Sequence, residues 1–100
     1  MGTVLAFSVK QNPEIKYQLK LYVTGPFEQS FRLVANVRKI CEELGERCEL
    51  SVIDVLQEPH LAEEDRVIAT PTLIKLSPSP VKRIVGDLSN IYEVIEQIRY

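Results

Sequence analysis

The hydrophobic pattern changes period twice across residues 17–55. Apolar residues alternate with polar ones over residues 17–23, which is typical of a strand, and a Gly-Pro pair at 25–26 ends the run. Residues 30–45 then carry apolar side chains at helical spacing, with a serine that can cap the start and a glycine that can end the helix. The β-branched residues of 48–55 are apolar on both faces, as in a strand that is covered on both sides. A strand, a long helix and a second strand predict a right-handed crossover with parallel strands.

The second half of the chain predicts two helices and two strands. A short helix begins at Pro59, since proline is tolerated in a first turn. Residues 72–76 form a third strand, the turn SPSP follows, and residues 81–85 return as a fourth strand antiparallel to the third. A last helix follows, for which Asp87, Ser89 or Asn90 can supply the cap. The complete order is βαβαββα.

Thr70-Pro71 stands at the start of the third strand, where a proline removes a ladder donor. Two interpretations are open: a trans proline that opens an edge strand, or a cis proline at a sharp turn. The order βαβαββα with Thr-Pro at this place resembles the thioredoxin fold, in which the proline is cis and lies beside the active site. That resemblance implies an α/β fold with a mixed four-stranded sheet and helices on both faces.

Composition indicates one soluble domain. One hundred residues with 45% hydrophobic and 26% charged residues suit a single globular core. A net charge of -2 without a block of like charges argues against nucleic acid as a partner. The apolar run at 4–9 is too short for a membrane span and lacks the basic start of a signal peptide, so a cytoplasmic protein is expected. We expect residues 1–14 to be an N-terminal extension, in which 4–9 could add a strand, and 15–100 to be the domain.

The residue types that would indicate catalysis are poorly placed. A thioredoxin enzyme needs a thiolate at the start of the first helix, and residues 24–30 contain no cysteine. Cys41 and Cys48 have the spacing of neither a redox pair nor a zinc site, and we expect small buried apolar residues. A bridge between them is sterically possible but unusual in a reducing cytoplasm. His60, the only histidine, is expected at the surface, and no phosphate-binding glycine array or cofactor site is predicted.

Two segments resemble the KaiB family, the small partner proteins of the bacterial circadian clock ATPase KaiC. They are LKLYVTG at 19–25 and VIDVLQEPHLAEEDRVIATPTLIKLSPSPVKRIVGDLS at 52–89, and the likeness extends over about 17–100. The resemblance implies a non-catalytic protein that binds a hexameric KaiC-like ATPase. Further implied partners are a KaiA-like activator, a sensor histidine kinase and a second copy of the chain, in a dimer or tetramer. The role would be circadian or stress-related.

Proteins of this family are known in two folds. One is thioredoxin-like and binds the ATPase ring, and the other is a tetrameric ground state with a rearranged second half. The period pattern corresponds to the first and does not by itself exclude the second. Two other functions stay open: a redox or peptide-binding protein that acts through Pro71 without a CxxC motif, and a stand-alone relative of the sensor domain that precedes some histidine kinases.

Several charged residues are candidates for partner binding. The cations Arg32, Lys75, Lys82 and Arg83 could meet an acidic ring surface, and Glu63 and Glu64 could meet basic residues of a partner. The alternative for each one is a solvated surface charge, because exposed pairs contribute little free energy.

Four residues are candidates for a structural switch. Thr70 and Pro71 begin the third strand, and Gly86 and Asp87 join the fourth strand to the last helix. Glycine at this junction tolerates backbone angles that other residues avoid, so the junction could be a hinge between two folds. The alternative is a plain turn in which Asp87 caps the helix.

Overall fold

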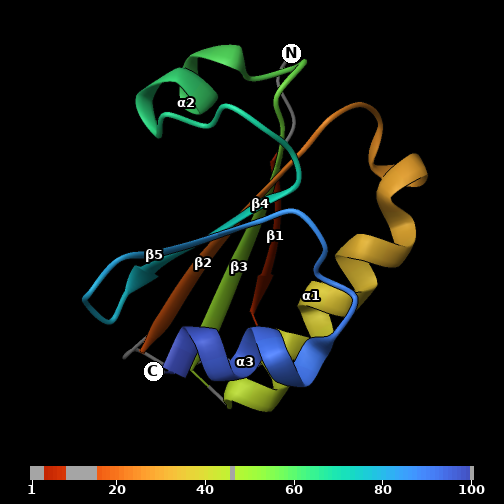
Figure 1. Ribbon diagram of the computed structural model, residues 1–100. Helices are drawn as coiled ribbons and strands as arrows, with labels where there is room; N and C mark the ends of the chain where they lie inside the picture. The colour runs from red at the N-terminus through yellow and green to blue at the C-terminus, as the bar shows by residue number, and fades with distance from the viewer. Residues whose placement is uncertain (1–3, 9–15, 46, 100) are drawn as a thin grey trace.

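The structure of the protein is a computed structural model that describes residues 4–8, 16–45 and 47–99. Figure 1 shows its strands and helices around one sheet. In chain order they are β1 (Val4–Ser8), β2 (Tyr17–Val23), the 3-10 turn η1 (Phe27–Ser30), α1 (Phe31–Leu44), β3 (Cys48–Asp54), α2 (Pro59–Glu64), β4 (Thr72–Ser77), β5 (Lys82–Val85) and α3 (Ile91–Arg99). The strand order in the sheet is β1-β3-β2-β4-β5.

The predicted crossover forms the centre of this sheet. β2 and β3 pair in parallel from Tyr17 opposite Cys48 to Val23 opposite Asp54. β4 lies antiparallel to β2, and β5 lies antiparallel to β4. The α/β class and the thioredoxin-like order are therefore confirmed, and this structure shows the thioredoxin-like arrangement of the second half.

The predicted number of strands was one too low. β1 pairs antiparallel with β3, in register from Val4 opposite Ile53 to Ser8 opposite Glu49, so the sheet has five strands. Residues assigned from the sequence to an extension thus extend the sheet. The physical reason is that β3 would otherwise be an edge strand with unpaired N–H and C=O groups. The backbone of β1 pairs with these groups.

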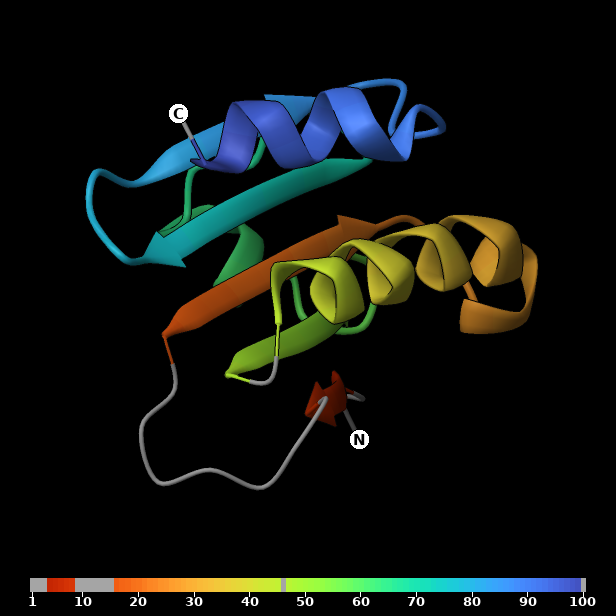
Figure 2. The same ribbon diagram turned by 90° about the horizontal axis from the view of Figure 1, so that it is seen from below.

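Helices cover both faces of the sheet, as predicted. Figure 2 shows α1 and α3 side by side on one face and α2 on the other. On the α1 and α3 face the larger core includes Leu21, Leu50 and Leu73 from the strands. On the α2 face a smaller core contains Tyr22, Ile53, Ala62 and Ile74. Neighbouring residues of one strand point to opposite faces, so both faces of β2 and β4 are apolar.

The predicted C-terminal stop of α1 at Gly45 is confirmed, whereas the predicted N-terminal cap by Ser30 is not. Ser30 stands at the N-cap position of α1, but its side chain makes no capping hydrogen bond. The turn η1 runs directly into the helix, so the backbone is already helical before the predicted start. Gly45 ends α1 as predicted, with a φ of +112° and its N–H donating to the Glu42 carbonyl at 3.1 Å.

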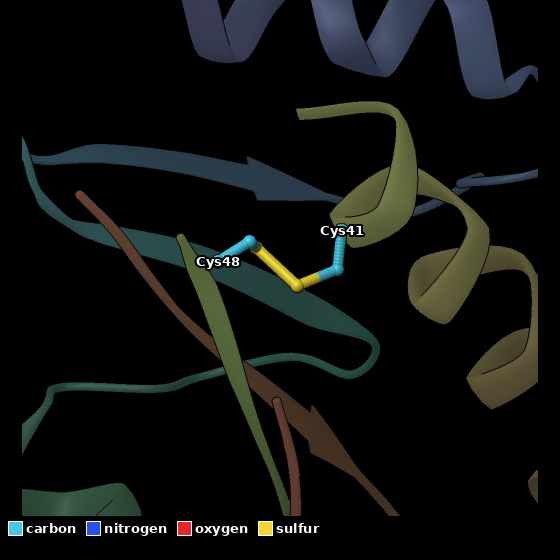
Figure 3. Close-up of a disulfide and its surroundings, with 2 residues drawn as sticks. All are labelled: Cys41 and Cys48. Atoms are coloured by element: carbon cyan, nitrogen blue, oxygen red, sulfur yellow. A yellow bond between two sulfur atoms is a disulfide. The ribbon is translucent and has the colours of Figure 1, made fainter. Parts of the chain in front are cut away.

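The two cysteines form a disulfide, which corrects the expectation of free apolar residues. Cys41 in the last turns of α1 and Cys48 at the start of β3 are joined, with their Cα atoms 5.5 Å apart. Figure 3 shows the bond between the helix and the strand. Both residues are buried, as predicted. The spacing of seven residues did not indicate a redox or metal pair, but the reversal of the chain after α1 brings the two sulfur atoms together.

Tyr22 connects the sheet to α2. Its side chain is fully buried, and its single hydroxyl proton is shared between two acceptors, the Leu61 carbonyl at 3.1 Å and the Asp65 carboxylate.

We expect Tyr22→Phe to lower the free energy of unfolding by about 1–2 kcal/mol, because two partly buried acceptors, one of them charged, lose their donor. Tyr92→Phe is the matched control, since Tyr92 is exposed. Urea unfolding should show a lower midpoint for the first variant only, and equal midpoints would contradict the role of the hydroxyl.

Candidate functional site

The ends of β2 and β3 and the start of β4 meet at one end of the sheet, which we call the Pro71 end. The Thr70-Pro71 peptide bond is cis, as the thioredoxin-like interpretation predicted. The Thr70 and Thr24 hydroxyl oxygens are 2.6 Å apart, and the Gly86 N–H donates to the Pro71 carbonyl at 3.1 Å. The structure therefore brings three of the four candidate switch residues into one set of contacts.

The fourth, Asp87, lies in the turn that follows Gly86. Gly86 has a φ of +102°, a conformation that disfavours any residue with a Cβ. The Asp87 carboxylate accepts a hydrogen bond from the Ser89 N–H at 2.9 Å. Hydrogen bonds from the Ser89 side chain and, to a smaller extent, from its N–H lower the pKa of the Asp87 side chain. The cap of α3 is Asn90, whose side-chain oxygen accepts from the Glu93 N–H at 3.2 Å. Of the three caps that the sequence left open, the structure selects Asn90.

A buried carboxylate fixes the loop where a thioredoxin enzyme would hold its thiol. Asp54, the last residue of β3, is buried and accepts hydrogen bonds from the N–H groups of Gly25 at 3.0 Å and Leu56 at 2.9 Å. One local signal could have indicated this role, an aspartate at the end of an otherwise apolar strand. A hollow lies beside this loop, lined by Gly25, Pro26, Phe27, Glu28, Asp54, Leu56 and Gln57.

Apolar side chains are exposed at the Pro71 end. Ile68, just before Thr70, is 98% exposed, and Leu56 and Val85 are also exposed although they are large and apolar. Leu56 follows β3 and Val85 ends β5, where it pairs with Thr72 at the start of β4. Three large apolar residues are thus exposed on segments that end or begin at the Pro71 end, and exposed apolar surface of this kind can bind another protein when it is contiguous. Sequence analysis did not identify these three residues, since their exposure follows from the arrangement of strand ends.

Two of the candidate cations are used inside the fold. Lys75 was expected at the surface, and this is wrong: its side chain is only 4% exposed and donates to the Ile98 carbonyl at 3.3 Å. Lys82, which pairs with Lys75 in the register of β4 and β5, donates to the Gln97 carbonyl at 2.9 Å. The two ammonium groups bind free carbonyls in the last turn of α3, where a helix favours positive charge. Burial, together with the charge of Lys82, lowers the pKa of Lys75.

Arg83, Glu63 and Glu64 lie on the other face of the sheet, around α2. Arg83 is exposed, and its guanidinium donates to the Asp65 carbonyl at the end of α2. Glu63 and Glu64 are exposed on α2 itself. Arg32 is exposed in the first turn of α1, at the Pro71 end, whereas Lys82 begins β5 at the opposite end. The candidate cations therefore do not form one patch.

The carboxylate of Asp65 is the centre of a polar cluster with Lys20 and Tyr22. Lys20 Nζ lies 2.9 Å from Asp65 Oδ2, which also accepts the Tyr22 hydroxyl. Burial raises the pKa of Asp65, but the hydrogen bonds from Tyr22 and Lys20 and the positive charges outweigh it, so the pKa lies below 3.8. Burial and the neighbouring carboxylate raise the pKa of Tyr22. The cluster is a structural tie between β2 and α2.

His60 is exposed, as predicted, and its Nε2 lies 3.6 Å from a Glu58 carboxylate oxygen. Among residues 4–8, 16–45 and 47–99 no three His, Cys, Asp or Glu side chains are placed to hold a metal ion. Over that same part of the chain no helix has the length and apolar character to span a bilayer.

Comparison with known proteins decides the family. A family model described as the KaiB domain matches residues 20–99. The chain belongs to the KaiB family. KaiB relatives include circadian clock protein KaiB3 of Synechocystis sp., 46% identical over 78 residues that cover 77% of this chain and 76% of the relative. Circadian clock oscillator protein KaiB of a Synechococcus sp. is 50% identical over 86 residues, 84% of this chain and 77% of the relative.

Solved structures confirm the fold of this KaiB-family chain. The N-terminal domain of SasA from Synechococcus elongatus is similar with a TM-score of 0.67 and 26% identity, covering 88% of this chain and 84% of that domain. Thioredoxin 1 from Thermosipho africanus gives a TM-score of 0.65 at 23% identity over 82% of this chain and 90% of the thioredoxin. The thioredoxin likeness establishes the fold alone.

The polar cluster predicts how stability responds to acid. The folded pKa of Asp65 lies below its unfolded value of about 3.8, so its stabilising contribution is complete above that value. It is lost as the pH falls through the folded pKa. We expect Asp65→Asn to lower the unfolding free energy at pH 7 by about 1–2 kcal/mol and to flatten its decline below pH 4. The measurement is urea unfolding at a series of pH values.

Glu63→Gln is the matched control for this prediction. It removes one negative charge from an exposed position on the same short helix. Its pH profile should follow that of the wild type. A profile for Asp65→Asn that coincides with both would show that the cluster does not contribute to acid stability.

Proposed function

We propose that this protein is a non-catalytic regulator that binds a hexameric KaiC-like ATPase ring and modulates the activity of the ring or its recruitment of another partner. The observation that carries the proposal is the KaiB domain over residues 20–99. The relatives described as circadian clock proteins, 46% and 50% identical, support it. A KaiA-like activator or a sensor histidine kinase is then a further partner, in circadian or stress-related signalling inside the cytoplasm.

Residues at the position of a thioredoxin active site support a binding role rather than a redox role. Residues 24–30 contain no thiol, and the cis Thr70-Pro71 bond faces Thr24 instead of a cysteine. The disulfide that the chain does have is buried and joins α1 to β3. What the Pro71 end offers to another molecule is apolar surface at Leu56, Ile68 and Val85. We assign the ring contact to this surface, with Arg32 and the exposed charges of α2 at its margin.

Co-elution tests the proposal. The wild-type protein is mixed with a purified KaiC-like hexamer and ATP and separated by size exclusion, and we expect it to elute with the ring. Ile68→Asp should weaken binding about 30-fold or more, because it places a charge at the centre of an apolar contact. Val81→Asp is the control, since Val81 is an exposed apolar residue before β5, at the other end of that strand from Val85. Failure of the wild type to bind, or equal binding by Ile68→Asp, contradicts the proposal.

The junction at Gly86 is proposed to be the hinge for any change of fold in the second half. We expect Gly86→Ala to lower the unfolding free energy by about 1–2 kcal/mol, because alanine is strained at a φ of +102°. If the junction is a hinge, NMR spectra should also show a second set of resonances across β4, β5 and α3. Gly45→Ala is the matched control, with a similar φ of +112° and equally open space around the added Cβ. Changes confined to the neighbourhood of residue 86 would leave only a plain turn.

A further inference from the structure

The Cys41–Cys48 disulfide lies where several elements end. Cys41 is 1% and Cys48 2% exposed, within the larger core. Beside Cys48, the Arg47 carbonyl accepts the N–H groups of Lys16 and Tyr17, both at 2.8 Å. The bond therefore holds the last turns of α1 against the strand start at which β2 also begins.

The same turn of α1 also holds the end of α3. The Arg99 guanidinium donates to the Glu43 carbonyl at 3.2 Å, two residues after Cys41. One residue earlier, the Ile98 carbonyl accepts the buried Lys75 ammonium. The C-terminal end of α3 is thus attached to β4 on one side and to the last turn of α1 on the other. If the last turn of α1 moves when the disulfide opens, the Glu43 carbonyl moves with it and its hydrogen bond to Arg99 of α3 is affected.

This disulfide is not placed for catalysis. Cys48 pairs with Tyr17 at the start of β2, whereas Thr72, next to Pro71, pairs with Tyr22. Five residues of strand separate the two positions, which is about 17 Å. The sulfur atoms are also buried, whereas a catalytic cysteine is partly exposed. In a reducing compartment, disulfides that are not catalytic are usually redox-sensing.

We propose that the Cys41–Cys48 disulfide is a redox-responsive cross-link that a dithiol reductant can open. Its redox state controls the stability of the contact between the last turn of α1 and the C-terminal end of α3. A reductant thiolate attacks one sulfur, the S–S bond breaks and a mixed disulfide forms. The second thiol of the reductant then releases the protein. The protein gains two electrons and two protons as two thiols, and the reductant becomes a disulfide.

Burial of the two sulfur atoms determines when a reductant can reach the disulfide. A reductant reaches the buried sulfur atoms only when the end of α1 moves away from the start of β3, so reduction follows local opening of the end of α1. Once reduced, the last turn of α1 is held only by noncovalent contacts, and Glu43 no longer offers Arg99 a fixed acceptor. The effect reaches α3 and spares α2, which is attached on the opposite face through Tyr22 and Asp65. This proposal does not depend on binding to an ATPase ring.

Thiol labelling tests the chemistry in the full-length protein. After mild oxidation, a maleimide reagent added in denaturant should label neither cysteine. After incubation with dithiothreitol without denaturant and removal of the reductant, it should label both. Labelling of both residues in the oxidised sample overturns the proposal, because no disulfide then exists. A bond that dithiothreitol opens only in urea also overturns it, because the disulfide is then a permanent cross-link.

Hydrogen exchange read by mass spectrometry tests the mechanical consequence. Reduced protein should exchange faster than oxidised protein in the last turn of α1 and in α3, with no change in α2. The Cys41→Ala/Cys48→Ala variant should match the reduced pattern under both conditions, and reduced wild type serves alone if the variant does not fold. Identical exchange in both redox states, or faster exchange in every element alike, overturns the proposal.

Discussion

The parallel pairing of β2 with β3 is the contact on which the rest of the structure depends. Parallel neighbours need a crossover, and α1 supplies it and covers one face of the pair. Once the pair exists, each strand has one free edge, and β1 and β4 take these edges. Features at both ends of β3 then fix its place: the disulfide at Cys48 and the two hydrogen bonds that Asp54 accepts. The end at Asp54 shapes the Pro71 end, and the end at Cys48 receives the end of α1.

The second half is attached to this centre by polar contacts as well as by apolar packing. On one face, Lys75 and Lys82 bind the carbonyls at the end of α3. On the other face, Arg83 binds the end of α2. All three cations lie on β4 and β5, so these two neighbouring strands bind a helix end on each face of the sheet. The apolar faces pack each helix against its side of the sheet, and these charged contacts satisfy carbonyl groups at the helix ends.

The positions of the helices and strands could be predicted from the sequence more accurately than the contacts of individual side chains. Hydrophobic period and the Gly and Pro positions located β2 to its residue and β4 within one residue, because these signals are local. Lys75 was misplaced because a lysine in a strand indicates an exposed position, and only the end of α3 packed against β4 makes burial of an ammonium group favourable. Cys41 and Cys48 are seven residues apart, but their distance in space depends on how the chain reverses after α1. The apolar surface at Leu56, Ile68 and Val85 depends on three strand ends at once, so no local pattern contains it.

The two cysteines lie at a different place along the sheet from the thiol of a thioredoxin-like enzyme. A thioredoxin-like enzyme needs a thiolate at a helix start, beside the cis proline, where a substrate can reach it. Here Thr24 occupies the side of the proline that a thiol would face, and Asp54 ties the loop through backbone N–H groups. The two sulfur atoms instead lie buried near the opposite end of β3, where they restrain the chain. At the Pro71 end the described residues therefore place exposed apolar side chains, Leu56, Ile68 and Val85, beside the cis proline, whereas the sulfur atoms lie away from it.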